Sequence, residues 1–168
     1  RTPDGGAWSG TESDAPTKGS ANPGSGVNAP GPGDVLINEF TADSATTEWV
    51  ELYNTTANDL DISNHYIDDM DGGGAPKLIP ANTIIPAGGY YVMDFTGLLN
   101  NGGDDVRFLD PAQAILDSTS YTYSTAEYSW YRYRDGLALS PAEIDSPTKN
   151  GSNNNMGAEP WTPGEFQI

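Results

Sequence analysis

The chain contains no cysteine, so disulfides, thiolate nucleophiles and cysteine-based metal sites are excluded. Basic residues are scarce, with 7 lysines and arginines against 24 acidic residues and a formal net charge of −17. Such a surface repels phosphate groups, which argues against nucleic acid and anionic lipid as partners. No run of about 18 apolar residues occurs, so no membrane insertion is predicted.

The length of 168 residues suits one medium domain with tails. Residues 1–33 are predicted to be the tail of a preceding repeat followed by a linker or docking segment, because Asn22–Gly33 is rich in proline and glycine. Residues 34–155 are expected to form the folded domain, and residues 156–168 to begin a following repeat or to form a terminal docking strand. A chain that starts at Arg1 also suggests a processed protein or a piece of a longer one.

No window of helical length shows apolar residues at a spacing of 3.6. Short segments with β-branched or aromatic residues instead alternate with turn signals such as Asp71-Gly72-Gly73-Gly74. This pattern predicts an all-β sandwich or barrel. The predicted strands are Val35–Phe40, Glu48–Tyr53, His65–Asp68, Thr83–Ile85, Tyr90–Asp94, Val106–Leu109, Ala114–Leu116 and Tyr128–Arg134.

The two ends of the chain repeat each other. At a fixed offset of 131, residues 1–37 align without gaps with residues 132–168, and 15 of the 37 pairs are identical, where average residue usage gives about two or three. Self-similarity at a fixed period is typical of arrays in which each unit contacts its neighbours. Two interpretations stay open: a window cut from a tandem protein, and terminal segments that dock units end to end.

Several sequence motifs follow one another in a recognisable order: VLINEF at 35–40, EWVELYN at 48–54, IIPAGGYYVM at 84–93, NNGGDDVRFLDP at 100–111, SWYRYRDG at 129–136 and SPTKNGSN at 146–153. Together they resemble the lamin tail domain, in the type found in secreted prokaryotic proteins. The resemblance implies an immunoglobulin-like β-sandwich over about residues 34–153, with residues 1–24 similar to the closing segment of a preceding copy. It implies no catalytic residues.

Candidate catalytic groups are few. His65 is the only histidine, and no Gly-x-Ser-x-Gly turn accompanies it, so it is expected to be a hydrogen-bonded core or rim residue rather than a base. Glu39, Glu48 and Glu51 resemble the paired carboxylates of acid–base catalysis, but a strand glutamate more often faces solvent or anchors a neighbouring loop. We therefore predict that the protein is not an enzyme.

Acidic residues beside glycine-rich turns suggest a calcium site, since calcium takes oxygen ligands from flexible loops. The candidate ligands are Asp68, Asp69, Asp71, Asp104 and Asp105. The alternative to a calcium site is a set of acidic turns exposed to solvent. Calcium binding would raise the unfolding temperature of chelator-treated protein, and no other cofactor is expected.

Two asparagines, Asn54 and Asn150, match the N-glycosylation pattern. In the aromatic stretch around Trp130, strand alternation is expected to place Trp130, Arg132 and Arg134 on one face and Ser129, Tyr131 and Tyr133 on the other. One face is expected to be core, and the other a protein contact surface or, alternatively, a platform on which sugars stack.

The sequence thus predicts an extracellular or cell-surface structural protein whose units join in series, with copies of itself or neighbouring domains of the same chain as partners. The alternative is a non-catalytic attachment module of a larger secreted or cell-surface protein. The residues predicted to make the connecting contacts are Pro16, Thr17, Lys18, Pro163, Gly164, Glu165, Phe166 and Ile168.

Overall fold

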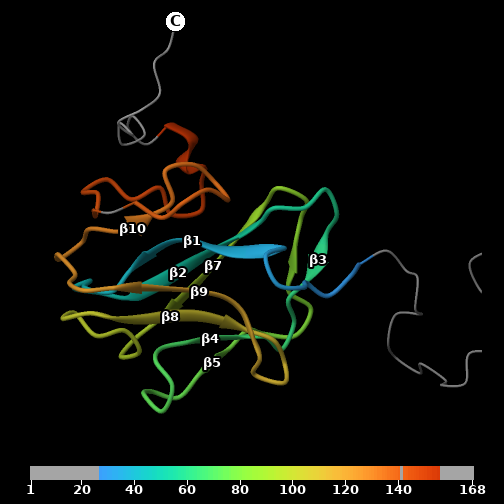
Figure 1. Ribbon diagram of the computed structural model, residues 1–168, viewed down its shortest axis with the longest axis horizontal. Coiled ribbons are helices and arrows are strands. Elements are labelled where there is room, and N and C mark those ends of the chain that lie inside the picture. Colours follow the sequence, from blue (N-terminus) through green and yellow to red (C-terminus); the bar gives the residue numbers. More distant parts are fainter. Residues whose placement is uncertain (1–26, 141, 156–168) are drawn as a thin grey trace, which may run out of the picture.

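The computed structural model of the protein describes residues 27–140 and 142–155 (Figure 1). The predicted connecting residues at positions 16–18 and 163–168 lie outside this range. The described chain contains no helix long and apolar enough to cross a bilayer. Its elements are β1 (Val35–Thr41), β2 (Glu48–Asn54), β3 (Leu60–Asp61), β4 (Tyr66–Asp68), β5 (Lys77–Leu78), β6 (Ile84–Ile85), β7 (Tyr90–Phe95), β8 (Asp104–Leu109), β9 (Ile115–Tyr121), β10 (Trp130–Tyr131) and the 3-10 turn η1 (Asn153–Asn155).

Two four-stranded antiparallel sheets form the two main layers of a sandwich (Figure 1). The first sheet has the order β10-β1-β2-β7 and the second the order β5-β4-β8-β9, while β3 and β6 make a small separate ladder. The strands are rich in valine, isoleucine, tyrosine and phenylalanine, which suit a pleated and half-buried surface. The predicted all-β, immunoglobulin-like sandwich is confirmed.

Apolar side chains from both sheets fill the space between the layers. Ile37 and Phe40 of β1 pack with residues of β2, β4 and β8 in one cluster of buried side chains. Burial of such side chains is the main favourable contribution to folding. The fully buried apolar members of the cluster include Val35, Ile37, Phe40, Val50, Leu52, Ile62, Ile67, Ile79, Ile85, Val106 and Phe108.

A β-bulge interrupts β1 at Asn38. The register with β2 runs Ile37↔Leu52 and then Glu39↔Glu51, so one residue of β1 is unpaired. In regular alternation Glu39 would share a face with Ile37. The bulge reverses this, placing Phe40 in the core and Glu39 on the outer face of the sheet.

The structure also differs from the predicted strand pattern in places. β9 extends to Tyr121 through the polar residues Ser118 to Ser120, whose exposed or half-exposed side chains carry no apolar signal. Ser129, Trp130 and Tyr131 are all buried, so the predicted division into one core face and one exposed contact face is wrong here.

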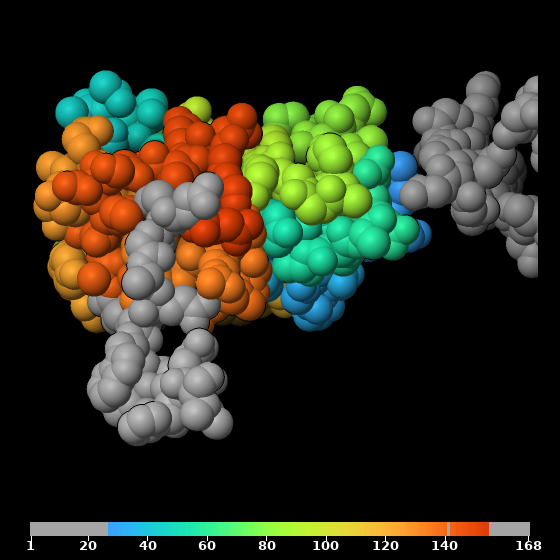
Figure 2. Space-filling model, turned by 90° about the horizontal axis from the view of Figure 1, so that it is seen from above, coloured from blue at the N-terminus to red at the C-terminus, as the bar shows by residue number. Residues whose placement is uncertain are grey.

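The reason is a third layer. Residues 132–140 and 142–155, here called the closing segment, cover the outer face of the first sheet, on the side away from β8 and β9 (Figure 1). Seen from above, they form a continuous orange and red surface over one half of the molecule (Figure 2). Two isolated bridges begin this cover, Ser129↔Ile144 and Arg132↔Leu139. The outer face of the first sheet is therefore an interior surface.

Candidate functional site

Two glutamates lie buried between the first sheet and the closing segment. Glu39 and Glu51 are direct cross-strand neighbours on β1 and β2, and each side chain is 0 % exposed. Like charges placed opposite one another destabilise a sheet unless other groups compensate. The hydrogen bonds of both carboxylates show what compensates.

Glu39 binds the closing segment at Thr148. The backbone N–H of Thr148 donates to both carboxylate oxygens at 3.1 Å, and its hydroxyl donates to Oε2 at 2.7 Å. Ser129 Oγ donates to Oε1 at 2.5 Å. Every partner of Glu39 is thus a donor, which suits an ionised carboxylate.

Glu51 binds the next residues of the same turn. The backbone N–H of Asn150 donates to Oε2 at 2.6 Å, and Asn38 Nδ2 donates to Oε1 at 2.9 Å. Asn150 has a φ of 63°, a left-handed conformation that asparagine tolerates better than most residues. The turn at 148–150 is therefore held by two carboxylates from two strands.

Asp135 joins the two ends of the closing segment to the sheet. Its Oδ1 accepts from Asn38 Nδ2 at 2.9 Å and from the backbone N–H of Asn153 at 3.0 Å. Its Oδ2 accepts from Tyr90 Oη at 2.6 Å and from Ser152 Oγ at 2.6 Å. One side chain thereby links β1, β7 and the C-terminal turn.

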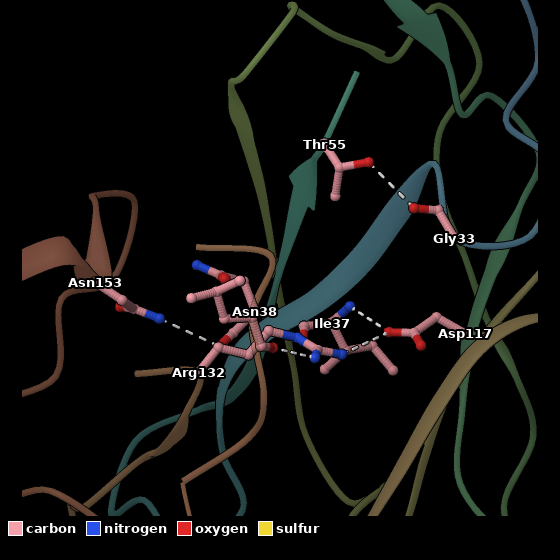
Figure 3. A network of polar contacts seen from close by, with 8 residues as sticks. Gly33, Ile37, Asn38, Thr55, Asp117, Arg132 and Asn153 are labelled. Carbon is pink, nitrogen blue, oxygen red and sulfur yellow. Dashed lines mark hydrogen bonds and ion pairs between the residues drawn. The ribbon is translucent and has the colours of Figure 1, made fainter. Parts of the chain in front are cut away.

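Arg132 connects all three layers (Figure 3). Its Nε donates to the carbonyl of Ile37 at 2.8 Å, and its guanidinium pairs with Asp117 of β9 at 3.3 Å. Asp117 also accepts the backbone N–H of Ile37 at 2.7 Å. Asn153 Nδ2 donates to the carbonyl of Asn38 at 3.2 Å from the other side (Figure 3). The bulged part of β1 is thus held by these side chains in addition to the backbone N–H of Arg132, which donates to the Asn38 carbonyl at 2.8 Å.

Lys149 makes the outermost contact of the turn. Its Nζ lies 2.5 Å from Asp94 of β7 and 5.5 Å from the ring centroid of Trp49. Both charged side chains of the pair are partly exposed, at 38 % and 52 %, so the pair contributes little to stability but marks the position of the turn.

Burial dominates the electrostatics of this site. Desolvation raises the pKa of Glu39, and it raises the pKa of Glu51 to about 7, to which the nearby charge of Glu39 adds. For Asp135, burial works in the same direction, but the hydrogen bonds from Ser152, Tyr90, Asn153 and Asn38 outweigh it and lower the pKa.

The raised pKa of Glu51 makes stability depend on pH. The folded state holds this proton more tightly than the unfolded chain, so the contribution is complete below about pH 4.5 and is lost as the pH rises through about 7. We expect the free energy of unfolding in urea to be about 2 kcal/mol larger at pH 5 than at pH 8. Glu51→Gln should remove most of this difference while the general effect of the acidic surface remains. If the free energy of unfolding changes with pH by the same amount in the wild type and in Glu51→Gln, the assignment to Glu51 is contradicted.

The other residues considered as catalytic candidates, Glu48 and His65, have structural roles. Glu48 anchors a neighbouring loop, since its carboxylate accepts from the backbone N–H groups of Gly97, Leu98 and Leu99 at 2.9–3.0 Å. His65 is 2 % exposed and its ring stacks on Phe108 with centroids 5.4 Å apart. The expected core histidine and loop-anchoring glutamate are both found.

The acidic residues proposed for calcium are used mostly within the fold. Asp68 pairs with Arg107 at 2.5 Å, Asp69 accepts from the backbone N–H of Gly74 at 2.6 Å, and Asp104 accepts from Asn100. Within residues 27–140 and 142–155, no three histidine, aspartate or glutamate side chains are grouped to hold a metal ion. Asp71 is exposed and Asp105 half-exposed. Calcium binding stays a prediction.

The two glycosylation candidates differ in exposure. Asn54 is 0 % exposed, and its Nδ2 donates to the carbonyls of Asn58, Ile85 and Pro86. The folded domain therefore does not offer Asn54 to a glycosyltransferase, contrary to the sequence pattern. Asn150 is exposed and stays a candidate.

The site itself was not predicted as a unit. Sequence reasoning considered Glu39 and Glu51 but did not pair them with Asp135, Thr148 and Asn153. One signal was available, because Asp135, Thr148 and Asn153 all belong to the identical pairs of the end-to-end repeat.

The fold is an antiparallel, immunoglobulin-like sandwich, and its buried polar groups bind its own backbone. The profile of the Lamin Tail Domain matches residues 28–123, more than half of the chain, and the protein belongs to this family. The family is non-enzymatic and often mediates protein interactions. No curated protein matches the chain. The match ends at residue 123, so the resemblance of residues 129–153 to the family's closing motifs stays an interpretation.

Proposed function

We propose that the chain is an extracellular structural protein whose sandwich units join in series, into a filament or surface array, through terminal segments. The observation that carries the proposal is that each four-stranded sheet ends in a long edge strand, β7 in the first sheet and β9 in the second. The unpaired backbone groups of an edge strand accept a further strand from another molecule. A head-to-tail contact of this kind, when it does not close, produces an open filament.

The ends of the chain supply strand-like sequence for such contacts. Residues 163–168 are similar to residues 32–37, of which Val35–Ile37 form the beginning of β1. A segment that resembles a strand of the domain can pair with the corresponding edge of a neighbour. No catalytic residues are proposed.

Negative-stain electron microscopy of the full chain tests this function. We expect ordered fibres with an axial repeat near the length of one domain. Dispersed particles at all concentrations would overturn the proposal and favour the alternative, a non-catalytic attachment module of a larger secreted or cell-surface protein. That alternative draws support from exposed apolar side chains, among them Met70, Leu78, Ile84, Ile115 and Leu137.

A deletion isolates the role of the N-terminal segment. Removal of residues 1–26 should abolish the fibres and leave the circular dichroism spectrum unchanged. The cut must stop there, because Asn28 accepts a hydrogen bond from the backbone N–H of Asp61 at 2.9 Å and Gly33 accepts one from Thr55 Oγ1 at 3.1 Å (Figure 3). Truncated protein that still polymerises would show that this segment is not a connector.

A further inference from the structure

We propose that residues 1–22 of one copy bind the outer face of the first sheet of a second copy, in place of that copy's own closing segment. The receiving surface consists of Asn38, Glu39, Glu51, Tyr90 and Asp94 and is here called the cradle. The inference rests on the proposed function, since it names a contact that joins one unit to the next, on the face of the first sheet and in addition to the edge-strand contacts proposed above.

Six polar side chains of the closing segment bind the rest of the domain, while Leu139 packs against the buried core and Tyr133 against the ring of Tyr131. Arg132 binds β1 and β9, Asp135 binds Asn38 and Tyr90, and Glu143 accepts the backbone N–H of Thr125 at 2.9 and 3.0 Å. Thr148, Lys149 and Asn153 bind Glu39, Asp94 and the carbonyl of Asn38.

The six polar contact residues recur in residues 1–22 at the same spacing, whereas Thr2 and Trp8 stand at the counterparts of Tyr133 and Leu139. Over this stretch 11 of the 22 aligned pairs are identical, so general relatedness alone would keep only about half of any chosen set. Six of these eight contact side chains are kept, including every polar one named above. The counterparts of Arg132, Asp135, Glu143, Thr148, Lys149 and Asn153 are Arg1, Asp4, Glu12, Thr17, Lys18 and Asn22.

The two left-handed positions of the closing segment, Gly136 and Asn150, both have glycine counterparts. Gly136 has a φ of 75° and lies against Tyr53, and Gly5 stands at its counterpart. The left-handed Asn150, with a φ of 63°, has Gly19 as its counterpart, and glycine can adopt this conformation at no steric cost.

Residues 1–22 differ from the closing segment at two positions that weaken their binding to the cradle. Ser20 replaces Gly151, where an added Cβ would lie 3.0 Å from the carbonyl oxygen of Thr148. Ala21 replaces Ser152 and loses its hydrogen bond to the aspartate. The closing segment is also tethered to its own cradle, which raises its effective concentration. An isolated chain therefore keeps its own segment, and exchange between copies requires high concentration or a weakened closing segment.

Matched variants of the full chain test the exchange. Thr148→Val with Asn153→Ala weakens the closing segment, and Thr17→Val with Asn22→Ala makes the same change in the N-terminal segment. Equal amounts of ¹⁵N-labelled and unlabelled chain are mixed and treated with a carbodiimide, which joins a lysine amine to a carboxylate in contact with it. The Lys149–Asp94 pair provides the internal reference, because its atoms lie 2.5 Å apart.

The expected product is a Lys18–Asp94 link between a labelled and an unlabelled chain. Its yield should rise roughly tenfold or more in Thr148→Val/Asn153→Ala over the wild type, since two hydrogen-bonding side chains are lost from the competing segment. It should be absent in Thr17→Val/Asn22→Ala. Lys18–Asp94 links that are missing, or that occur only within single chains, would overturn the proposal.

If Thr148→Val/Asn153→Ala does not fold, a peptide of residues 1–24 added in excess should restore its β-sheet spectrum, and the same peptide carrying Thr17→Val and Asn22→Ala should not. Failure of both peptides would overturn the proposal. Fibres without an interchain Lys18–Asp94 link would leave serial assembly intact through another contact. If the interchain Lys18–Asp94 link forms but no fibres are seen, the cradle contact is supported and the proposed filament is contradicted.

Discussion

Replacement of Glu39 by alanine is expected to lower the free energy of unfolding by about 3 kcal/mol at pH 8, because Ser129 Oγ and the Thr148 N–H and hydroxyl lose their shared acceptor. Ser129 is 0 % exposed, so water cannot replace the carboxylate there without opening the structure. The release of a buried carboxylate from its desolvation offsets only part of this cost.

Urea unfolding measures this loss, and limited trypsin digestion shows where it acts. Cleavage after Lys149 should become much faster in Glu39→Ala, since the turn at 148–150 is no longer held. The matched control is Glu127→Ala, in which an exposed carboxylate that accepts from the backbone N–H of Ala45 at 2.6 Å is removed. It should cost less than about 1 kcal/mol. A Glu39→Ala protein as stable and as protease-resistant as the control would show that the closing segment is held by other groups.

The positions of Glu39 and Glu51 show that both faces of β1 and β2 are buried. A glutamate in a strand predicts a solvent-facing side chain, and neighbouring apolar residues predict the core. Here the strands carry apolar side chains on the inner face and carboxylates on the outer face, and both faces are buried, because the closing segment forms a third layer. The domain therefore depends on residues that come about a hundred positions later in the chain.

Local sequence was sufficient where apolar content decides the structure. Valine, isoleucine and aromatic residues marked β1, β2, β7 and β8 to within a few residues, and the glycine-rich turns marked their ends. It was insufficient where the partner lies far away. The polar half of β9 becomes a strand only through its pairing with β8, and no local signal reports that pairing.

The bulge at Asn38 is also a feature that local sequence does not predict. Nothing in the sequence VLINEF distinguishes a regular strand from one that changes face at Asn38. The change is stabilised by Arg132, whose backbone N–H donates to the Asn38 carbonyl at 2.8 Å, and by Asn153. Asp135, Thr148 and Asn153 could have been proposed as site residues from the repeat alone, because each is identical between the two ends of the chain.

The second large effect is expected for Asp135→Ala, at about 3 kcal/mol, because Tyr90 Oη and the Asn153 N–H lose their acceptor. Asp135→Asn should cost less, since the amide oxygen still accepts from one of these donors. An unfolding free energy of Asp135→Ala within about 0.5 kcal/mol of the wild type would contradict a linking role for this side chain.

The decisive measurement combines the two sites. Glu39 and Asp135 both fasten the closing segment to the first sheet. If the removal of either one detaches the segment, the contacts of the other are already lost, and removing it as well should cost little more. Glu39→Ala/Asp135→Ala should therefore cost well below the sum of the single variants, with a coupling of about 1–3 kcal/mol in a double-mutant cycle. Strict additivity would mean that each carboxylate stabilises only its own surroundings, and the closing segment would then not detach as one unit. Since exchange between copies requires such a unit, the same cycle measures whether the domain can release what a neighbour is proposed to replace.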